Sequence, residues 1–391
     1  MLSKKTRFVV LDYFLFIGLV LLFTGFFWQL KTTRLQTSYY FWVVLPIVCS
    51  LFYHFKTYPF KRLFFFTFLF ILYSVLSVFW SDNLSFSTFF SQFKKLILIL
   101  SLFFAIAYIN KKFIYFEKLV LHLMLFCAAF LAFYNIIDLV TTVGLDGRIS
   151  GWGILDNANI TAEVFGMVFI FSFICFLQTK DKIAAGGYFL LCLLFFIEIL
   201  LNKSRGQQFA LFITLILIIL WLPKIYWKRL LGVIFGFFIV LLVFYFYSDF
   251  LTTIFNRKLT FSCRDTIWRD LLQSALKTPF FGRGEGASSG YITYCSEMAY
   301  QALIGTHSVY MNIFLYQGAM GLFLALLVIF YALKTAYQSK YKADCFWGMI
   351  IIYGLIAFIP NGDSLLSRPN EMWILFWIPL AFLASRTKPL L

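Results

Sequence analysis

Residues 183–201 read IAAGGYFLLCLLFFIEILL, and Glu198 is the single charged side chain in this stretch. Apolar residues occupy every face of a helix drawn through it, so such a helix would contact lipid or lie deep in a core. A helix rises about 1.5 Å per residue, and about 20 apolar residues cross the hydrocarbon layer of a bilayer. The stretch therefore predicts a membrane-spanning helix.

The rest of the chain repeats this pattern. Of its 391 residues, 62% are hydrophobic and 13% are charged, and the mean hydropathy is +0.87. A soluble domain is about half apolar and about a quarter charged, so this composition excludes a soluble globular fold. The apolar runs are continuous and do not alternate with polar residues, which disfavours a transmembrane β-barrel. We therefore expect an all-α polytopic membrane protein.

Charged or turn-rich joints divide the apolar runs into about twelve predicted spans. These spans cover residues 8–27, 41–55, 62–80, 89–109, 117–140, 157–178, 184–201, 206–222, 230–248, 308–333, 345–360 and 370–385. No small-x-small cleavage site follows the first apolar run, so we expect an uncleaved first helix. Residues 1–391 then form a single integral membrane domain. One long segment, 249–307, connects the ninth and tenth spans.

The charge of the chain is strongly unbalanced. The 33 Lys and Arg oppose 17 Asp and Glu, for a formal net charge of +16. Basic residues of membrane proteins collect in short cytoplasmic loops, whereas long loops are exempt from this rule. With both termini in the cytoplasm, more than half of the basic residues fall in cytoplasmic segments, and the segment 249–307 becomes an external module. Membrane topology therefore accounts for the charge, and we expect no nucleic-acid partner.

Membrane topology does not account for four basic residues on the predicted external face. They are Arg148, Lys203, Arg205 and Arg264. The planar fork of arginine suits phosphate groups, and a helix N-terminus adds N–H groups that favour anions. The alternative is interfacial snorkelling or ion pairing, which we prefer for Arg269 and Arg283.

His307 lies where the long segment re-enters the membrane, in Gly305-Thr306-His307-Ser308. Histidine is the side chain best suited to proton transfer near neutral pH, so His307 is a candidate general base. The other two histidines, His54 and His122, lie at the end of a predicted span and inside one. We interpret both as structural.

Other motifs give weaker signals. The glycine-rich stretch 281–286 has no preceding strand and no following Lys-Ser/Thr, so we interpret it as a flexible turn of the external module and not as a nucleotide loop. The acidic residues form no D-x-D cluster and the cysteines form no C-x-x-C pair, so we expect no metal and no other cofactor. Cys263 and Cys295 both lie in the segment 249–307, and either a disulfide or two free thiols fits there.

The order of these landmarks resembles the O-antigen ligase/polymerase superfamily of bacterial inner-membrane glycosyltransferases. The likeness is carried by Arg148–Asn159, Lys203–Gly206, Arg264–Trp268 with Thr278–Gly284, and His307–Tyr310 followed by Gly318 and Gly321. Members of this superfamily often carry His-Asn where this chain has His307-Ser308, so Ser308 departs from the pattern. The likeness covers residues 148–330 by motif and the whole chain by topology.

The resemblance implies an inverting, metal-independent transfer of a glycan from undecaprenyl diphosphate at the periplasmic leaflet. It implies that His307 is the general base on the acceptor hydroxyl. Arg205 and Arg264 would bind the diphosphate of the donor and stabilise the charge that develops on the leaving group, a role in which preorganised donors are effective.

The resemblance also suggests supporting residues. Arg148 and Lys203 would add contacts to the diphosphate, and Gln207 is a further candidate. Asp363 and Arg368, in the external joint before the last span, would line the acceptor side.

Several functions stay open. The re-entry pattern at 148–159 favours a ligase, with lipid A–core as its acceptor, over a polymerase, whose acceptor is a second lipid-linked repeat. A protein O-glycosyltransferase is a third candidate. A flippase or other transporter of lipid-linked glycans is the alternative from a different class, and it predicts ionisable residues along a path and paired broken helices. Membrane lipids are expected partners, and the oligomeric state is open.

Overall fold

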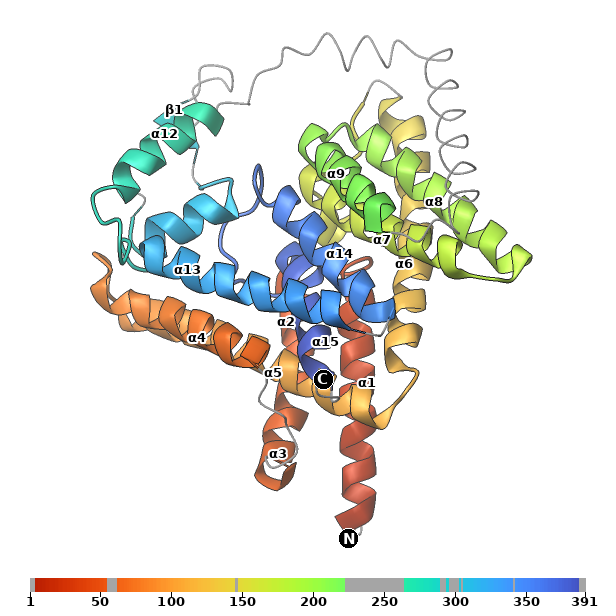
Figure 1. Ribbon diagram of the computed structural model, residues 1–391, viewed down its shortest axis with the longest axis horizontal. Helices are drawn as coiled ribbons and strands as arrows, with labels where there is room; N and C mark the ends of the chain where they lie inside the picture. Colours follow the sequence, from red (N-terminus) through yellow and green to blue (C-terminus); the bar gives the residue numbers. More distant parts are fainter. Residues whose placement is uncertain are drawn as a thin grey trace.

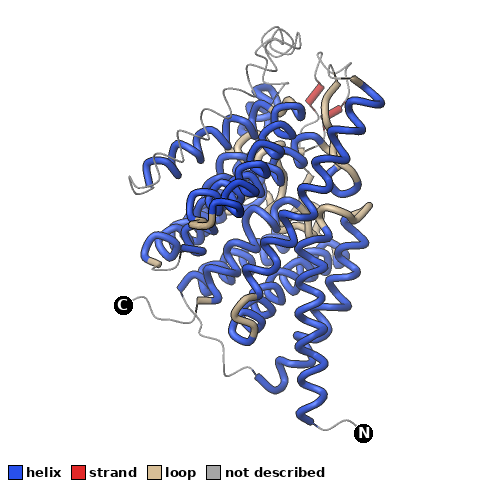
Figure 2. The backbone as a smooth tube through the Cα atoms, turned by 90° about the vertical axis from the view of Figure 1, so that its right-hand side faces the viewer, coloured by secondary structure: helices blue, strands red, loops and turns tan. Residues whose placement is uncertain are grey.

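The structure is a computed structural model that describes residues 4–54, 62–144, 147–221, 264–288, 293–294, 302–303, 305–339 and 342–386. These residues are mainly helical, as Figures 1 and 2 show. One short antiparallel pair joins β1 (Thr293–Tyr294) to β2 (Ala302–Leu303), with Thr293 opposite Leu303. The all-helical architecture expected from the apolar runs is therefore confirmed apart from this pair.

The α-helices are α1 (Lys4–Gly25), α2 (Thr32–Tyr39), α3 (Leu45–His54), α4 (Arg62–Leu76), α5 (Phe86–Lys112), α6 (Phe116–Asp138), α7 (Ala158–Gln178), α8 (Lys182–Asn202), α9 (Arg205–Trp221), α12 (Arg264–Ala275), α13 (Val309–Gln338), α14 (Lys342–Ala357) and α15 (Ile378–Ser385). Short π-helical turns cover Tyr40–Val44, Leu139–Val143 and Trp373–Trp377. Short 3-10 turns cover Ser77–Trp80 and Gly153–Leu155.

Six helical segments within the described residues are long and apolar enough to cross a membrane. They are Arg62–Trp80, Phe86–Lys112, Phe116–Thr142, Ala158–Gln178, Lys182–Asn202 and Val309–Gln338. Four shorter apolar helices accompany them at Leu11–Gly25, Arg205–Leu220, Asp344–Ala357 and Trp373–Ser385. These ranges coincide with predicted spans, which supports a polytopic membrane protein. The predicted span 230–248 lies outside the described residues, and the total of twelve stays a prediction.

The buried core is centred on the last helical segment, 373–385. Trp373 and Trp377 have no exposed surface, and α15 packs against α5 and α14. Around this centre α13 lies along α4, and α7 packs against α8 and α9 (Figure 1). The start of α1 lies at the opposite end of the molecule from β1 and α12 in Figure 1, and Figure 2 shows the strands at the end away from it.

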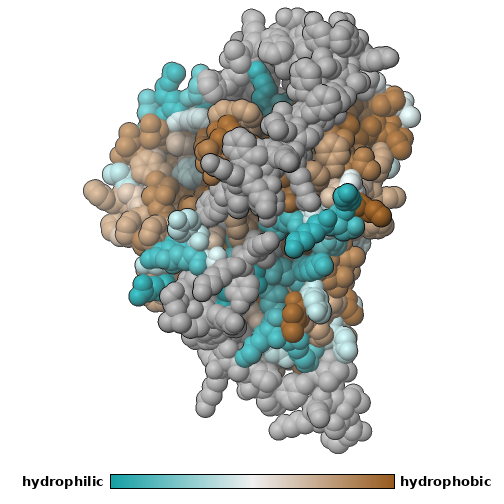
Figure 3. Space-filling view, turned by 45° about the vertical axis from the view of Figure 1, so that its right-hand side comes forward, coloured by the Kyte–Doolittle hydropathy of each residue, from teal (hydrophilic) through white to brown (hydrophobic). Residues whose placement is uncertain are grey.

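The exterior carries large apolar side chains. Phe126 and Phe130 on α6 are each 73% exposed, and Leu190 on α8 is 65% exposed. Figure 3 shows broad apolar areas beside smaller hydrophilic patches on one face of the molecule. Soluble monomers rarely expose contiguous apolar patches of this kind, so the surface is suited to lipid contact.

Helix α13 is broken at Gly318, where φ is +66°. The gap is filled by residues 278–286, here called the insert. Insert N–H groups donate to the carbonyls that the break leaves open, and insert carbonyls accept from the N–H groups after it. The bonds are Arg283 N to Leu315 O (2.9 Å), Gly284 N to Tyr316 O (2.8 Å), Ala319 N to Pro279 O (2.8 Å) and Met320 N to Phe280 O (3.1 Å). Backbone groups at membrane depth need such partners.

The insert corrects the expectation of a flexible turn at 281–286. A Cβ on Gly282 would lie 2.4 Å from the carbonyl carbon of Tyr316, and one on Gly284 would lie 2.5 Å from Ser77 O. Both glycines have positive φ angles. The glycines are therefore needed for close backbone packing against α13 and the turn before α5, and they do not form a loose loop.

Candidate active site

His307 stands in a tight turn directly before α13. Its φ is +46°, a left-handed conformation that is uncommon for residues other than glycine. A single carboxylate oxygen, Asp363 Oδ1, accepts the N–H of Thr306 at 2.9 Å, the hydroxyl of Thr306 at 3.1 Å and the N–H of His307 at 3.2 Å. The turn is thus fixed from the 358–370 connection, which places Asp363 beside the candidate base.

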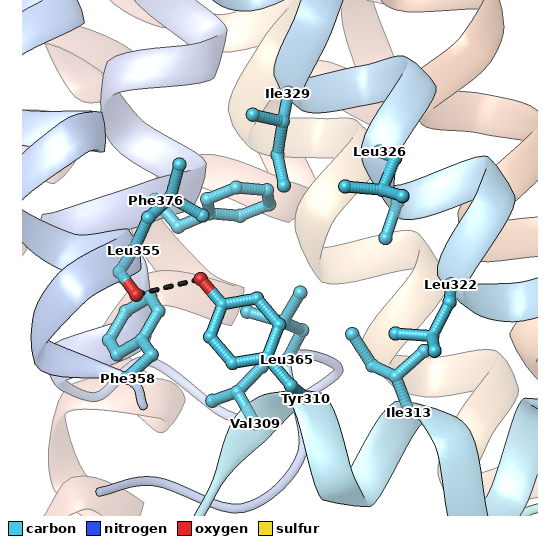
Figure 4. A pocket seen from close by; sticks show the side chains of 11 residues that line it. Val309, Tyr310, Ile313, Leu322, Leu326, Ile329, Leu355, Phe358, Leu365 and Phe376 are labelled. Atoms are coloured by element: carbon cyan, nitrogen blue, oxygen red, sulfur yellow. Dashed lines mark hydrogen bonds between the residues drawn. The ribbon is translucent and has the colours of Figure 1, made fainter. Parts of the chain in front are cut away.

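The imidazole of His307 is partly exposed and makes no hydrogen bond or ion pair with the described residues. The next turn of α13 is anchored below it. Tyr310 donates its hydroxyl to Leu355 O at 2.7 Å, at the edge of a small apolar cavity of about 20 Å³ (Figure 4). Figure 4 shows Phe358 and Phe376 on the side of Leu355. At about 20 Å³ the cavity is too small for a sugar. Tyr310 therefore ties the first turn of α13 to α14.

Helix α12 brings Arg264 to the same region. Trp268, one turn after Arg264, donates its indole N–H to Thr306 O at 3.2 Å. Residues i and i+4 share a helix face, so Arg264 and Trp268 lie on the same side of α12. Arg264 is partly buried, and this burial lowers the pKa of its guanidinium.

The other three basic candidates cluster where α8 passes into α9. Lys203 ends α8 in a left-handed conformation with φ of +57°, and Arg205 is the first residue of α9. Arg148 donates its Nε to Asn202 O at 2.7 Å and its Nη2 to Asn159 Oδ1 at 2.9 Å. Arg148 is thus committed to holding the backbone of this corner, which limits its freedom to bind a donor.

Arg205 differs from Arg148 because its side chain is exposed and has no hydrogen bond or ion pair among the described residues. It stands at the N-terminus of a helix, where backbone N–H groups and the helix dipole favour anions. An uncommitted guanidinium at such a position is suited to a phosphate group.

Gln207, a candidate contact to the donor diphosphate, has its side chain directed into the protein. It is 2% exposed, and its amide nitrogen donates to Glu163 Oε1 at 3.0 Å. The same carboxylate oxygen accepts Asn361 Nδ2 at 2.7 Å. Gln207 therefore acts inside the protein, and Glu163 and Asn361 are residues that sequence reasoning missed. The sequence signal that could have indicated Glu163 is an acidic residue within an apolar predicted helix.

A second buried acid lies in the insert. Glu285 is 5% exposed and accepts Gln317 Nε2 at 2.9 Å and Gln92 Nε2 at 3.4 Å. Burial raises the pKa of Glu285, although the hydrogen bond from Gln317 and the charge of Lys95 oppose this shift. Arg368, exposed in the joint before the last helix, also lies within electrostatic range of Lys95.

The remaining predictions have mixed outcomes. Arg283 forms the expected ion pair, with Asp82 as its partner at 2.8 Å. His122 is hydrogen-bonded to Tyr188 Oη and Lys118 O, both at 2.7 Å, which agrees with the structural role expected for it. The His54 side chain and the residues Cys263 and Cys295 lie outside the described residues. Within the described part of the chain, no group of three or more His, Cys, Asp or Glu is placed to hold a metal ion.

Comparison with known proteins points to one family. A family model described as O-antigen ligase matches residues 189–326. An O-antigen ligase from Pseudomonas aeruginosa is 26% identical over 239 residues, which make up 60% of this chain and 56% of that protein. The alignment thus spans little more than half of the relative's length. The family match includes Arg205, Arg264 and His307, and both similarities are to O-antigen ligases.

Proposed function

We propose that this protein is an O-antigen ligase of lipopolysaccharide biosynthesis. It transfers a glycan from undecaprenyl diphosphate to lipid A–core at the periplasmic face of the bacterial inner membrane, with both termini in the cytoplasm. The observation that carries the proposal is that the family match at 189–326 includes an uncommitted arginine at a helix start, Arg205, and a histidine held in a strained turn, His307.

The proposed chemistry is a single inverting displacement. The imidazole of His307 takes the proton of the acceptor hydroxyl while the hydroxyl oxygen attacks the anomeric carbon on the face opposite the diphosphate. The bond between the anomeric carbon and the diphosphate oxygen breaks, and undecaprenyl diphosphate leaves with the electron pair. A diphosphate leaves as an anion, so no acid is needed to protonate it.

The arginines supply the electrostatic contribution in this proposal. Arg205 and Arg264 bind the diphosphate and stabilise the negative charge that grows on the oxygen released from the anomeric carbon. The partial burial of Arg264 supports this role, because a charge–charge attraction is stronger where water is displaced. Lys203 adds positive charge next to Arg205. If these cations balance the whole negative charge of the diphosphate, the transfer needs no metal ion.

Two supporting residues take modified roles. Arg148 holds the backbone between α8 and α9 through its two described hydrogen bonds. It contributes positive charge to the diphosphate site without contacting the donor. Asp363 holds the histidine turn, and Arg368 remains a candidate contact on the acceptor side.

A transporter of lipid-linked glycans is the second candidate. The break of α13 at Gly318 favours it, because transporters bind substrates at broken helices. Transporter folds pair such helices between repeats, and α13 is the broken helix among those described. The name of the Pseudomonas relative favours a ligase over a polymerase or a transporter.

One assay separates these functions. Purified protein receives a labelled glycan on undecaprenyl diphosphate together with both acceptors, lipid A–core and a second lipid-linked repeat. We expect label on lipid A–core. Label on the lipid-linked repeat would identify a polymerase, and transfer to neither, with movement of the donor across a vesicle membrane, would identify a transporter.

A further inference from the structure

A chain of hydrogen bonds begins at the arginine-bearing corner and leads into the protein. Arg148 donates to Asn159 Oδ1 at 2.9 Å, and Ser204 Oγ lies 2.8 Å from the same oxygen. Ser204 Oγ also contacts Gln207 Oε1, so its one hydroxyl hydrogen donates to either amide oxygen. Gln207 then donates to Glu163 Oε1 at 3.0 Å. The corner that carries Lys203 and Arg205 is thus tied to one carboxyl group on α7.

A second arm leaves the same carboxylate oxygen toward the histidine turn. Asn361 donates to Glu163 Oε1 at 2.7 Å, and Asp363, two residues later, binds the N–H groups of Thr306 and His307. Glu163 Oε1 is therefore the junction between the corner that carries Arg205 and the turn that carries His307.

The backbone between the two arms is tightly packed. Gly362 has a φ of +84°, and a Cβ there would lie 2.3 Å from Met372 Cε and 2.9 Å from Val309 Cγ2. On the other side, a Cβ on Gly206 would lie 2.9 Å from Pro360 Cγ. A displacement of Asn361 is therefore transmitted to Asp363 with little slack.

The junction is buried in apolar surroundings. Glu163 is 0% exposed, and it lies among buried apolar residues of α7 such as Val164 and Phe165. Its second oxygen, Oε2, has no hydrogen-bond partner among the described residues. Burying a carboxyl group is costly, and a well-packed apolar side chain often stabilises such a position better. Stability alone therefore does not explain a carboxyl group here.

We infer that Glu163 and Asn361 are positioning residues that fix the distance between the diphosphate-binding corner and the general base. This inference rests on the proposed function. The reaction requires the anomeric carbon, held through the diphosphate at Arg205, to meet a hydroxyl held at His307. Misplacement of reacting groups by about 1 Å can cost about 100-fold in rate.

The test compares Glu163→Leu with a matched control, Glu198→Leu. Glu198 is also a 0% exposed glutamate in an apolar helix, and its Oε1 accepts Asn135 Nδ2 at 2.8 Å. Its described bonds do not lead to either turn. We expect Glu163→Leu to lower kcat by about 100-fold while the KM for the donor changes less than about twofold. Glu198→Leu should leave both parameters unchanged.

Two further variants separate positioning from folding. Glu163→Gln keeps an oxygen that accepts both amides, and it should restore most of the kcat lost in Glu163→Leu. Asn361→Leu should lower kcat similarly, and the Glu163→Leu/Asn361→Leu double variant should lose little more, because both changes break one chain. Fully additive losses, or no rescue by glutamine, would overturn the inference.

A second readout does not depend on transfer. Hydrogen exchange of the Thr306 and His307 amides should be at least about fivefold faster in Glu163→Leu than in Glu198→Leu, because their acceptor Asp363 loses its anchor. Equal exchange would overturn the coupling, and faster exchange with unchanged kcat would overturn the positioning role. A wild-type protein that transfers to no acceptor would refute the proposed function, and the exchange comparison would still decide the coupling.

Discussion

Asp363 Oδ1 accepts the backbone N–H of His307 at 3.2 Å, and the same oxygen accepts both donors of Thr306. An exposed carboxylate from the 358–370 connection thus determines where the candidate base stands. The indole N–H of Trp268, which donates to Thr306 O at 3.2 Å, holds the same turn from α12.

We predict that Asp363→Ala lowers the rate of transfer by about 10- to 100-fold, because two N–H groups lose a charged acceptor and the turn relaxes. Asp363→Asn keeps an acceptor oxygen and should retain most of the activity. Steady-state transfer kinetics check this. If the asparagine variant is as inactive as the alanine variant, the charge of Asp363 and not its hydrogen bonding matters.

Arg205→Lys keeps the charge at the start of α9 but removes the planar fork. We expect transfer to fall by at least about tenfold, since hydrogen bonds to charged groups contribute about 1.5–3 kcal/mol and lysine cannot bind a phosphate in a bidentate way. Arg269→Lys is the control, because Arg269 is exposed on α12 and has no described partner. Equal kcat/KM values for the two variants would show that Arg205 is a snorkelling residue.

Much of the architecture could be predicted from the sequence. The apolar runs placed helices correctly at 62–80, 89–109 and 184–201, because a continuous apolar stretch in a membrane protein has no stable alternative to a helix. The position of His307 directly before a helix was also foreseen, since a polar turn met an apolar run there.

Other features depend on contacts that no local pattern encodes. The insert 278–286 looked like a loose glycine-rich turn because its partners at Leu315 and Tyr316 follow more than 30 residues later. Gln207 looked like a ligand contact because it follows Arg205, yet the helix turns it toward Glu163. The pairing of Asn361 with Glu163 joins residues nearly 200 positions apart.

The contact between the insert and the break in α13 should not tolerate added side chains. Gly318→Ala would place a Cβ 2.5 Å from Gly282 N, and the backbone at φ +66° and ψ −163° is a region that only glycine adopts readily, at a cost of about 1–3 kcal/mol for other residues. We expect a clearly lower Tm in detergent. Gly187→Ala is the control, because nothing lies within 4 Å of its Cβ position, and a mid-helix alanine should stabilise by up to about 1 kcal/mol. Equal Tm values would contradict the docking of the insert.

Glu285 should make stability depend on pH. Burial raises its pKa above the ordinary value of 4.5, so between the two pKa values the folded protein binds more protons than the unfolded chain. Stability is then highest below about pH 4.5 and falls as the pH rises through the raised folded pKa. Glu285→Gln should remove this dependence and raise Tm at neutral pH. A Tm that falls with pH equally in both proteins would assign the effect to another group.

The most direct test of the account is the transfer of labelled glycan to lipid A–core by wild type and His307→Ala, each in the presence of a metal chelator. We predict that wild type transfers at its full rate, releasing undecaprenyl diphosphate. His307→Ala should bind the donor normally but transfer about 100- to 10,000-fold more slowly, the range that a lost general base produces. Near-normal transfer by His307→Ala would contradict the central claim that this histidine takes the proton of the acceptor.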